Sequence, residues 1–239
     1  MEKRSDTLVI IPTYNETGNL EKLLREIQAL GLGLDLLVID DNSPDGTGRL
    51  ADRLSQEMPL AVIHRPGKLG IGSAHKEGFR HAITRGYRQA ITMDADFSHS
   101  PRYLRPMLER SQQADVVVGS RYIPGGGLHG WSVPRLLLTH TAHLLTRVCL
   151  GIPQDCTGGF RLYQIERLRN LRFDDVKAEG YAFLMEMLFL VQRQGFTIQE
   201  IPIVINSRHH GKSKISKREI FRAVVTLARL MPRRARPAR

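Results

Sequence analysis

Two aspartates one residue apart, Asp94 and Asp96, lie in the stretch MDADFSHSP at residues 93–101, directly after an apolar run. Burying a charge is costly unless the charge is paired or holds a metal ion. Side chains at i and i+2 can point the same way at the end of a strand, and two carboxylates together with water can hold Mg²⁺ or Mn²⁺. A structural alternative is that Asp96, Ser98 or Ser100 caps the helix that follows.

Apolar, β-branched runs alternate with amphipathic segments over the first half of the chain. The expected strands are residues 7–12, 34–41, 60–65, 89–96 and 114–122, and the expected helices are 19–30, 46–58, most of 67–86 after Ser73, and 102–113. This alternation predicts an α/β fold with a mainly parallel, twisted sheet and helices on both faces.

Three polar clusters follow the carboxyl ends of these strands. They are residues 12–16 (PTYNE), Asp40 with Asp41, and Asp94 with Asp96. In open parallel sheets, ligands bind at the carboxyl ends of the strands. We therefore expect the three clusters to meet at one edge of the sheet.

The pattern changes after residue 122. We expect loops at 123–131 and 208–214, a buried helix at 181–195, a strand at 197–206, and amphipathic helices at about 133–150 and 215–231. In the helix at 133–150 the polar side chains share one arc and the leucines the other. No repeat or linker divides the chain, so we expect one domain over residues 1–231 and a basic tail at 232–239.

The composition is that of an ordinary soluble protein, with 41% hydrophobic and 25% charged residues among 239. The sequence contains no run of about 18 apolar residues that could span a membrane, and its first residues lack the apolar core of a signal peptide. The two cysteines, Cys149 and Cys156, do not form a disulfide framework. We expect a cytoplasmic protein with reduced thiols.

The excess positive charge is concentrated near the C-terminus. The chain has 35 Lys and Arg against 24 Asp and Glu, and residues 208–239 carry 11 of these basic residues but a single acid, Glu219. Such a segment favours an anionic surface, whether lipid headgroups, nucleic acid or phosphates. The alternative is a solvated, partly disordered tail.

Nine segments, in order, resemble those of the polyprenyl-phosphate (dolichol-phosphate) mannose synthases, inverting glycosyltransferases of family 2. They are PTYNE (12–16), VIDDNSPDGTG (38–48), RPGKLGIGSAHKEGFRHA (65–82), MDADFSHSP (93–101), VGSRY (118–122), GGGLHGWS (125–132), DCTGGFRLY (155–163), GYAFLMEM (180–187) and RHHGKSK (208–214). The resemblance implies a GT-A, Rossmann-like nucleotide-sugar-binding fold. It also implies transfer of mannose from GDP-mannose to a polyprenyl phosphate with inversion, assisted by Mg²⁺ or Mn²⁺.

The resemblance assigns a donor site. Its residues are Pro12, Tyr14, Glu16, Ile39, Asp41, Asp94, Ala95, Asp96, Arg121, Arg208 and Lys214. Tyr14 can pack on the base or ribose, Glu16 can accept from ribose hydroxyls, and Asp41 can accept from a guanine edge. The alternative for the first turn is a helix entry capped by Asn15 or Asn19.

For the metal, the resemblance indicates Asp94 and Asp96, with Asp96 as the direct ligand. Many relatives carry glutamine at the position of Ser98, where the shorter serine leaves room for water to take its place. Asp40, beside the base-binding Asp41, has a structural role as its alternative.

Arg121, Arg208 and Lys214 match basic positions of the family at the diphosphate and the acceptor phosphate. With Asp96, the two arginines are the residues we expect to act in catalysis. A donor diphosphate, a leaving nucleotide and an anionic acceptor share one pocket, so the pocket needs cations. The alternatives are that Arg121 pairs with an acid such as Asp155 and that the other two belong to the basic tail.

The polar face of the helix at 133–150 is expected to gather the acceptor phosphate through Arg135, His140, His143 and Arg147. Its leucines would rest on the protein or enter the membrane interface. Both histidines have a structural role as their alternative. A phosphate monoester, with a second pKa of about 6, is already largely a dianion at neutral pH, so we expect no dedicated general base.

The last helix places Ile220, Phe221, Val224, Val225 and Ala228 near one another, flanked by arginines. The alternative is that this helix packs on the domain and only the tail is free. We expect peripheral attachment to the cytoplasmic face of a membrane, with recruitment by a separate membrane-anchoring protein left open.

Two other functions fit part of the sequence. A sister enzyme would move another sugar, such as glucose from UDP-glucose, to the same lipid. A nucleic-acid-binding module would explain the basic tail but none of the acids at the strand ends, so no nucleic-acid partner is expected.

Overall fold

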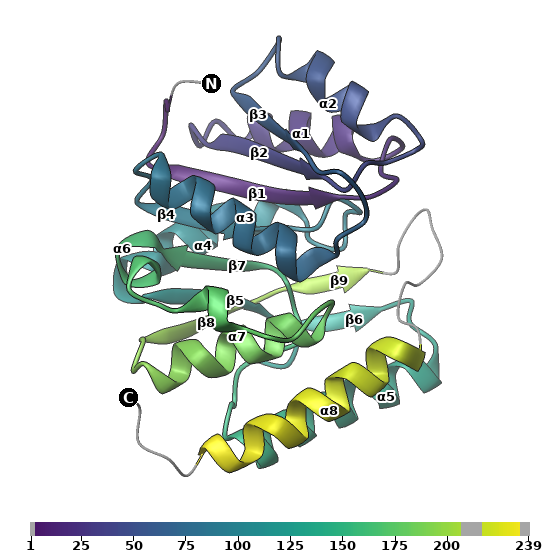
Figure 1. Cartoon of the computed structure of the whole chain (residues 1–239), viewed down its shortest axis with the longest axis vertical. Helices are drawn as coiled ribbons and strands as arrows, with labels where there is room; N and C mark the ends of the chain where they lie inside the picture. The colour runs from purple at the N-terminus through teal and green to yellow at the C-terminus, as the bar shows by residue number, and fades with distance from the viewer. Residues whose placement is uncertain (1–2, 207–216, 235–239) are drawn as a thin grey trace.

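The structure is a computed structural model that describes residues 3–206 and 217–234. A 7-stranded sheet crosses the molecule in the order β3-β2-β1-β4-β7-β5-β8 (Figure 1). Its strands are β1 (Thr7–Thr13), β2 (Asp35–Asp40), β3 (Leu60–His64), β4 (Gln89–Thr92), β5 (Val116–Ser120), β7 (Arg161–Gln164) and β8 (Ile198–Pro202). β7 runs antiparallel to both of its neighbours, and the other pairs are parallel. The predicted α/β fold with a mainly parallel sheet is therefore confirmed.

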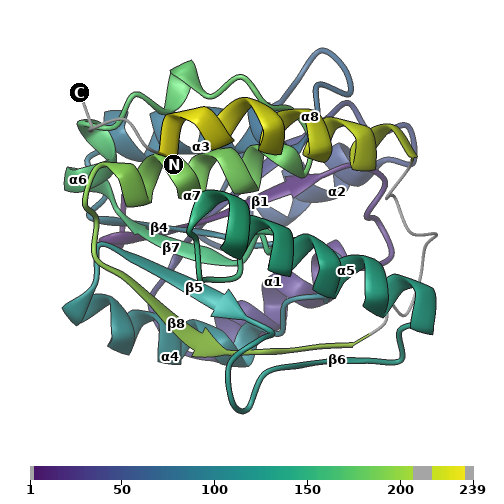
Figure 2. The ribbon, with the colours of Figure 1, turned by 90° about the horizontal axis from the view of Figure 1, so that it is seen from below.

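Helices cover both faces of this sheet (Figures 1 and 2). They are α1 (Leu20–Ala29), α2 (Thr47–Leu54), α3 (Ile71–Thr84), α4 (Leu104–Arg110), α5 (Val133–Leu145), α6 (Ile165–Arg169), α7 (Ala182–Arg193) and α8 (Lys217–Arg234). Short 3₁₀ turns occupy Pro101–Tyr103, Ser111–Gln113 and Phe173–Asp175, and a π-helical turn continues α5 over Thr146–Leu150.

Two apolar cores lie on opposite sides of the sheet. Alternate residues of β1 enter different cores, with Leu8 and Ile10 in the one that contains α3, α6 and α7, and Val9 and Ile11 in the one that contains α1, α2 and α4. A strand buried on both faces must be apolar at nearly every position. This is why the strands are continuous hydrophobic runs in the sequence.

The strand register brings the polar clusters together. Thr13 at the end of β1 is paired with Asp40 at the end of β2, and the next N–H, that of Asp41, donates to the Thr13 carbonyl (3.0 Å). On the other side of β1, the N–H of Met93 after β4 donates to the Ile10 carbonyl (3.0 Å). The chain therefore leaves β1, β2 and β4 at one edge of the sheet.

Three features differ from the sequence predictions. β4 ends at Thr92 rather than at residue 96, because the chain turns away toward Phe97, whose φ is 60°. The strand expected at 197–206 is divided: β8 pairs with β5, whereas β9 (Val204–Asn206) pairs with β6 (Gly127–His129) in a separate 2-stranded sheet, where a loop was expected. β7 and α6 were not predicted.

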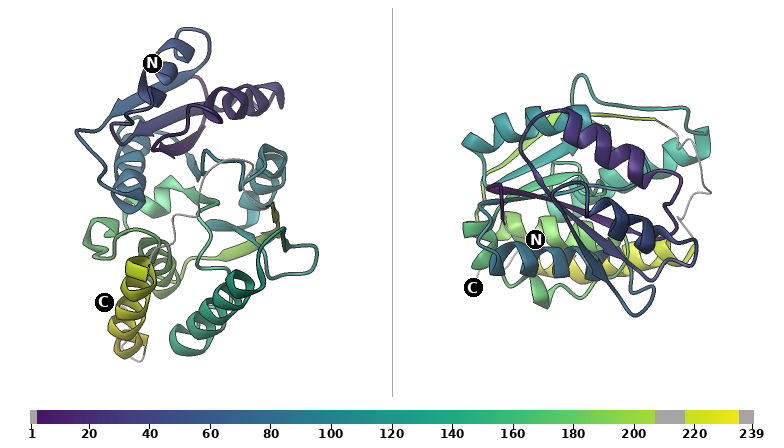
Figure 3. Two further views of the ribbon diagram at one scale, coloured as in Figure 1. Left: turned by 90° about the vertical axis from the view of Figure 1, so that its right-hand side faces the viewer. Right: turned by 90° about the horizontal axis from the view of Figure 1, so that it is seen from above.

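α5 and α8 lie at the end of the molecule beyond β8 (Figure 1), and Figure 3 (left) shows them standing apart from each other. α8 packs on α7 and on the π-helical turn that follows α5. It continues through Pro232 to Arg234, past the expected end at residue 231. Across the described residues, no helix is both long and apolar enough to cross a membrane.

Candidate functional site

A cavity of about 330 Å³ lies where β1, β2 and β4 end, and we call it the donor-side cavity. The sequence-predicted residues that line it are Pro12, Tyr14, Glu16, Asp41, Asp94, Ala95 and Asp96. Ile39 is fully buried in the core and supports the site without lining it. The three polar clusters thus meet as expected.

The turn after β1 is held by hydroxyl groups from the connection between β2 and α2. The N–H of Asn15, where φ is 61°, donates to Ser43 Oγ (3.0 Å), and the N–H of Glu16 donates to Thr47 Oγ1 (2.9 Å). Asn19 stands at the N-cap of α1, but its amide donates to the Glu16 carboxylate (2.9 Å). These contacts fix the backbone that presents Tyr14 and Glu16 to the cavity.

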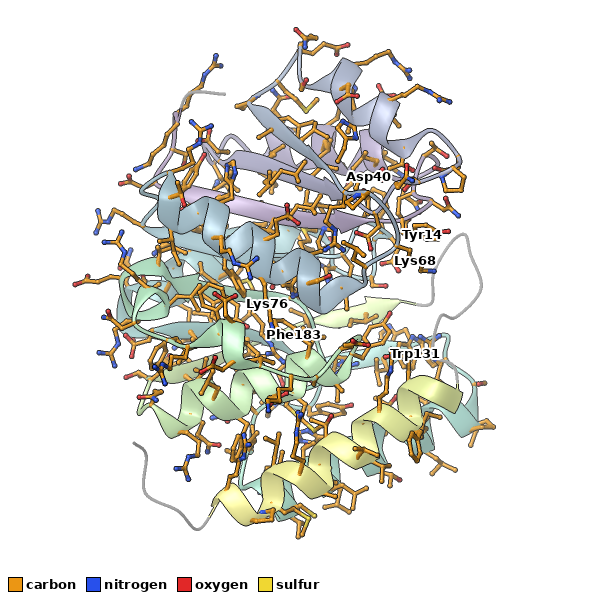
Figure 4. All side chains as sticks on the ribbon, viewed as in Figure 1. Tyr14, Asp40, Lys68, Lys76, Trp131 and Phe183 are labelled. Carbon is orange, nitrogen blue, oxygen red and sulfur yellow. The ribbon has the colours of Figure 1, made fainter. Side chains whose placement is uncertain are left out.

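Tyr14 carries a cation on its ring. Lys68 Nζ lies 4.0 Å from the ring centre, a distance at which an ammonium group is attracted by the aromatic face. Both side chains line the donor-side cavity, and Figure 4 shows them next to each other. The cavity wall therefore presents an aromatic ring and a positive charge together.

Asp41 is held in one orientation from two sides. Arg65 Nε donates to Oδ1 (2.6 Å), and the N–H of Gly70 donates to Oδ2 (3.0 Å). Arg65 is itself buried and donates to Ser73 Oγ (2.7 Å). The position predicted to recognise the base is therefore a preorganised, ion-paired carboxylate.

Asp40 has a structural role. Its carboxylate accepts from Thr13 Oγ1 (2.9 Å) and from the N–H of Ser43 (2.9 Å). It is buried, and it ties β1 to the turn that follows β2.

The loop that carries the two aspartates after β4 is anchored by a histidine. The N–H of Asp94 donates to His99 Nδ1 (3.1 Å), and the N–H of Ser98 donates to Asp96 Oδ1 (3.0 Å). His99 is buried and stacks on Phe160, with ring centres 5.1 Å apart and planes at 14°. Sequence reasoning missed His99, because a lone histidine in a loop carries no pattern that reveals a buried backbone contact.

The two aspartates fit a divalent cation that keeps several ligands from outside the protein. Both carboxylates line one cavity, and Mg²⁺ is commonly bound by one or two carboxylates together with substrate phosphates. Within the described part of the chain, no group of three or more His, Cys, Asp or Glu could hold a metal by itself. Ser98 lines the neighbouring cavity instead, so its role as a third ligand stays a prediction.

A second cavity, of about 260 Å³, extends from Asp94 to the space between α5 and α8, and we call it the groove. Polar side chains from the sheet edge and the start of α5 line part of it, among them Ser98, Arg121, Arg135 and Thr139. The lining from α5, α7 and α8 is mainly apolar and includes Leu138, Leu145, Met185, Val224 and Leu227. The groove therefore joins a polar region to an apolar one.

The donor-side cavity and the groove share three lining residues, Asp94, Tyr181 and Glu219. Tyr181 belongs to the loop before α7. Hydrogen bonds connect this loop to α8 in two places. Glu219 of α8 accepts from the Tyr181 N–H (3.1 Å), and Glu186 accepts from two N–H groups of this loop and from Arg229 of α8 (2.5 Å). The two compartments thus meet at Asp94, one of the two aspartates predicted to bind a metal ion.

The outer surfaces of α5 and α8 are apolar. Apart from Leu69, every exposed large hydrophobic side chain in the described part of the chain lies on α5, its π-helical extension or α8. Phe221 is 69% exposed and Leu137 64%. The predicted apolar stripe of the last helix is therefore exposed, although α8 itself packs on α7 and on the π-helical turn, where Thr226 and Leu230 are buried.

Arg121 forms the buried ion pair that the sequence left as an alternative. Its Nε and Nη2 donate to the two carboxylate oxygens of Asp155 (2.7 and 2.6 Å), and Nη2 also donates to Thr157 Oγ1 (2.5 Å). Burial opposes ionisation of Asp155, but the charge and hydrogen bonds of Arg121 outweigh it and lower the pKa of Asp155 to about 2. Arg121 also lines the groove, where its held charge faces any ligand.

The four residues predicted to gather the acceptor phosphate do not lie together. Arg135 lines the groove. His143 stacks on Tyr122, with ring centres 4.0 Å apart, and burial lowers its pKa, whereas His140 meets the same ring edge-on at 5.4 Å. Arg147 is exposed on the π-helical turn. The contacts of His143 support its structural alternative. Arg208 and Lys214 lie outside the described residues.

Comparison with known proteins gives one family. A model described as glycosyl transferase family 2 matches residues 8–172. The chain is 40% identical over 226 residues to the polyprenol monophosphomannose synthase of Mycolicibacterium smegmatis, covering 93% of this chain and 85% of that protein. It is 41% identical over 224 residues to the undecaprenyl-phosphate mannosyltransferase of Micrococcus luteus, covering 93% and 92%.

Solved structures share the fold at lower identity. Glucosyl-3-phosphoglycerate synthase from Mycobacterium tuberculosis, in complex with Mn²⁺, UDP and glucosyl-3-phosphoglycerate, superposes with a TM-score of 0.68 at 21% identity, over 96% of this chain and 80% of that one. The same enzyme with Mn²⁺, UDP-glucose and phosphoglyceric acid gives a TM-score of 0.69 at 20% identity, over 98% and 81%.

The pKa of Asp155 leads to a pH prediction. Because its folded-state pKa of about 2 lies below the ordinary value of 3.8, the ion pair stabilises the fold above about pH 4 and is lost as pH falls through about 2. The shift corresponds to about 2 kcal/mol. Denaturant unfolding should be measured at a series of pH values. Between about pH 4 and pH 2, the free energy of unfolding of the wild type should fall by about 2 kcal/mol more than that of Asp155→Asn.

The exposed acid Asp175, 4.0 Å from Arg172, is a matched control. Asp175→Asn should keep the wild-type pH dependence. Parallel curves for the wild type and Asp155→Asn would show that the pair does not govern acid stability.

Proposed function

The chain belongs to glycosyl transferase family 2, and we propose that it transfers mannose from GDP-mannose to a polyprenyl phosphate. The products would be GDP and polyprenyl-phosphate mannose, with inversion at the anomeric carbon. The names of the two relatives that are 40% and 41% identical over most of the chain support both the sugar and the lipid.

The observation that carries this proposal is the junction of two unlike compartments. A polar cavity that could hold a nucleotide diphosphate meets an apolar groove at Asp94, Tyr181 and Glu219. A sugar nucleotide on one side and a prenyl phosphate on the other would bring their reacting groups to this junction. A water-soluble acceptor would make few favourable contacts with the apolar side chains of α5 and α8 in the groove.

On the donor side, Asp94 and Asp96 would hold Mg²⁺ or Mn²⁺, and Asp41 would accept from the base. When bound, the metal neutralises charge on the departing diphosphate. The Mn²⁺ in the fold relatives from Mycobacterium tuberculosis supports a divalent cation in this fold. Tyr14 and Lys68 would flank the nucleotide at the mouth of the same cavity.

On the acceptor side, Arg121 and Arg135 would face the phosphate, joined by Arg208 and Lys214 as the sequence predicts. Cations held in place before the ligands arrive let two anions approach each other at low cost. The prenyl chain would lie along Leu138, Leu145 and other apolar side chains of the groove.

A panel of donors and acceptors tests the function. Purified protein should form product from GDP-mannose and a short polyprenyl phosphate only when Mg²⁺ or Mn²⁺ is present, and should prefer GDP-mannose to UDP-glucose. A preference for UDP-glucose would identify the sister activity. Salt-sensitive binding to DNA without transfer from any donor would instead favour the nucleic-acid alternative.

The metal assignment predicts the effect of Asp96→Asn, which keeps the size of the side chain and removes its charge. Transfer should fall by roughly a hundredfold or more, because stabilisation by a metal ion is worth several kcal/mol. Mn²⁺ titration followed by electron paramagnetic resonance should show weakened binding while circular dichroism shows an intact fold. Asp52→Asn, at an exposed acid, is the control; wild-type turnover by the Asp96 variant would remove this residue from the site.

The acceptor chemistry predicts that no carboxylate acts as a base. Asp155, Glu186 and Glu219 are bonded to Arg121, Arg229 and Arg222, respectively. Of these three acids, Glu219 is the one that lines both compartments beside Asp94. Because a phosphate acceptor is already largely a dianion at neutral pH, Glu219→Gln should keep kcat within about a few-fold.

Rapid-quench measurement of the transfer step checks this. A large loss that a small exogenous base such as formate restores would identify Glu219 as the general base and contradict the base-free mechanism.

The exposed apolar faces support attachment to a membrane surface, which we place at the cytoplasmic side. Phe221→Ser with Leu137→Ser should weaken binding to anionic vesicles by about tenfold or more, since each side chain contributes roughly 1 kcal/mol or more when buried in lipid. The melting temperature should be unchanged because both side chains are exposed. Leu69→Ser is the matched control. Wild-type protein that fails to bind vesicles would point to recruitment by a separate membrane protein.

A further inference from the structure

Trp131, the single tryptophan of the chain, lines the groove directly before α5. Its ring is partly buried against the apolar core that contains α1, α2 and α4. The backbone that leads to it is fixed as well, because β6 ends at His129 in a pairing with β9, and Gly130 turns the chain with a φ of 72°. In the view of Figure 4, Trp131 is labelled near the N-terminal part of α8. The indole is therefore a firmly held part of the groove wall.

Arg135 lies over this ring. Its guanidinium carbon is 3.6 Å from the ring centre, the shortest distance between a cation and a ring in the described structure. Trp131 directly precedes the N-cap residue Ser132, whose backbone is extended, and Arg135 lies in the first turn of α5, which begins at Val133. A guanidinium resting on an aromatic face keeps its N–H donors in its own plane, where a phosphate can accept two of them at once.

Arg121, the other arginine that lines the groove, is oriented by an ion pair. Asp155 holds two donors of Arg121 in a buried pair. Arg135 is on the surface helix α5, where every residue keeps part of its surface exposed. A long side chain in such a place loses considerable rotamer freedom when it must bind a ligand in one orientation.

We propose that Trp131 is a positioning residue for the acceptor, whose indole face holds the Arg135 guanidinium in the orientation that binds the lipid phosphate. This inference rests on the proposed function, because it takes a prenyl phosphate as the ligand of the groove. It adds a residue that acts on acceptor binding and leaves donor binding and the metal unaffected.

Tyr122 provides a useful contrast. It stacks on His143 of the same helix at 4.0 Å and donates to the Thr139 carbonyl (3.3 Å), and it does not itself line the groove. Tyr122 therefore serves the docking of α5, whereas the pair of Trp131 and Arg135 is in the wall itself.

The wild-type protein supplies the first test, because its fluorescence comes from Trp131 as the single indole. Titration with a short prenyl phosphate should change the emission maximum or intensity. The reason is that a phosphate bound to Arg135 changes the electric field that the guanidinium exerts on the indole. The corresponding prenol, which has the same chain and no phosphate, should produce a clearly smaller change. Equal responses to the two lipids would overturn the proposal without any variant having to fold.

Kinetics supply the second test. Trp131→Leu should raise the KM for prenyl phosphate by about tenfold, as expected from the loss of one cation contact with a ring, and should leave kcat and the KM for the donor nearly unchanged. Trp131→Phe should restore part of the loss because it keeps an aromatic face. Arg135→Lys should resemble Trp131→Leu, and the double variant should be no worse than either single one, because both act through the same guanidinium.

The outcomes separate this inference from the proposed function. Wild-type turnover of prenyl phosphate with an unchanged acceptor KM in Trp131→Leu overturns the positioning role alone. Additive losses in the double variant also overturn it. Absence of turnover with every prenyl phosphate and nucleotide sugar overturns the proposed function, and the positioning role for this ligand with it.

Discussion

The buried ion pair of Arg121 with Asp155 helps to connect the end of β5 to the end of β4, at the edge of the sheet where the two cavities lie. Asp155 begins the segment that enters β7, and a few residues later the Gly159 carbonyl accepts from Thr92 at the end of β4 (2.6 Å). The same short segment is therefore bonded to the end of β5 and to the end of β4. Breaking such a pair on one side leaves an uncompensated buried charge, which is strongly destabilising.

β7 adds a second buried charge at the same place. Arg161 is fully buried in the middle of the sheet and donates to the carbonyls of Leu184 (2.7 Å) and Cys156 (2.9 Å). The neighbouring His75 is also buried, and burial followed by the charge of Arg161 lowers its pKa to about 3, so it stays neutral. The interior behind the site therefore holds the charge of Arg161 beside a neutral His75. Such a field favours the anions that a glycosyl transfer to phosphate brings together.

Much of this arrangement follows from local pattern. Tyr14, Asp41 and Asp94 were expected at one edge because parallel strands buried on both faces produce unmistakable apolar runs, and their ends must coincide. β7 gave no such signal, because it has four residues and begins with an arginine whose burial depends on carbonyls far away in sequence. Arg121 had two chemically reasonable partners, and only the fold brings Asp155 to it. His99 anchors the aspartate loop through a contact that no spacing encodes.

The groove opens between two helices whose outward faces are themselves apolar. A prenyl chain exposed to water would cost roughly 0.8 kcal/mol for each CH₂ group, so a lipid of several isoprene units cannot leave a bilayer to find an enzyme. With α5 and α8 attached to a membrane as proposed, the prenyl chain would pass from the bilayer into the groove without being exposed to water. The search for the acceptor then becomes diffusion in two dimensions. Only the phosphate, which already lies at the level of the lipid headgroups, would have to leave water and bind the arginines of the groove.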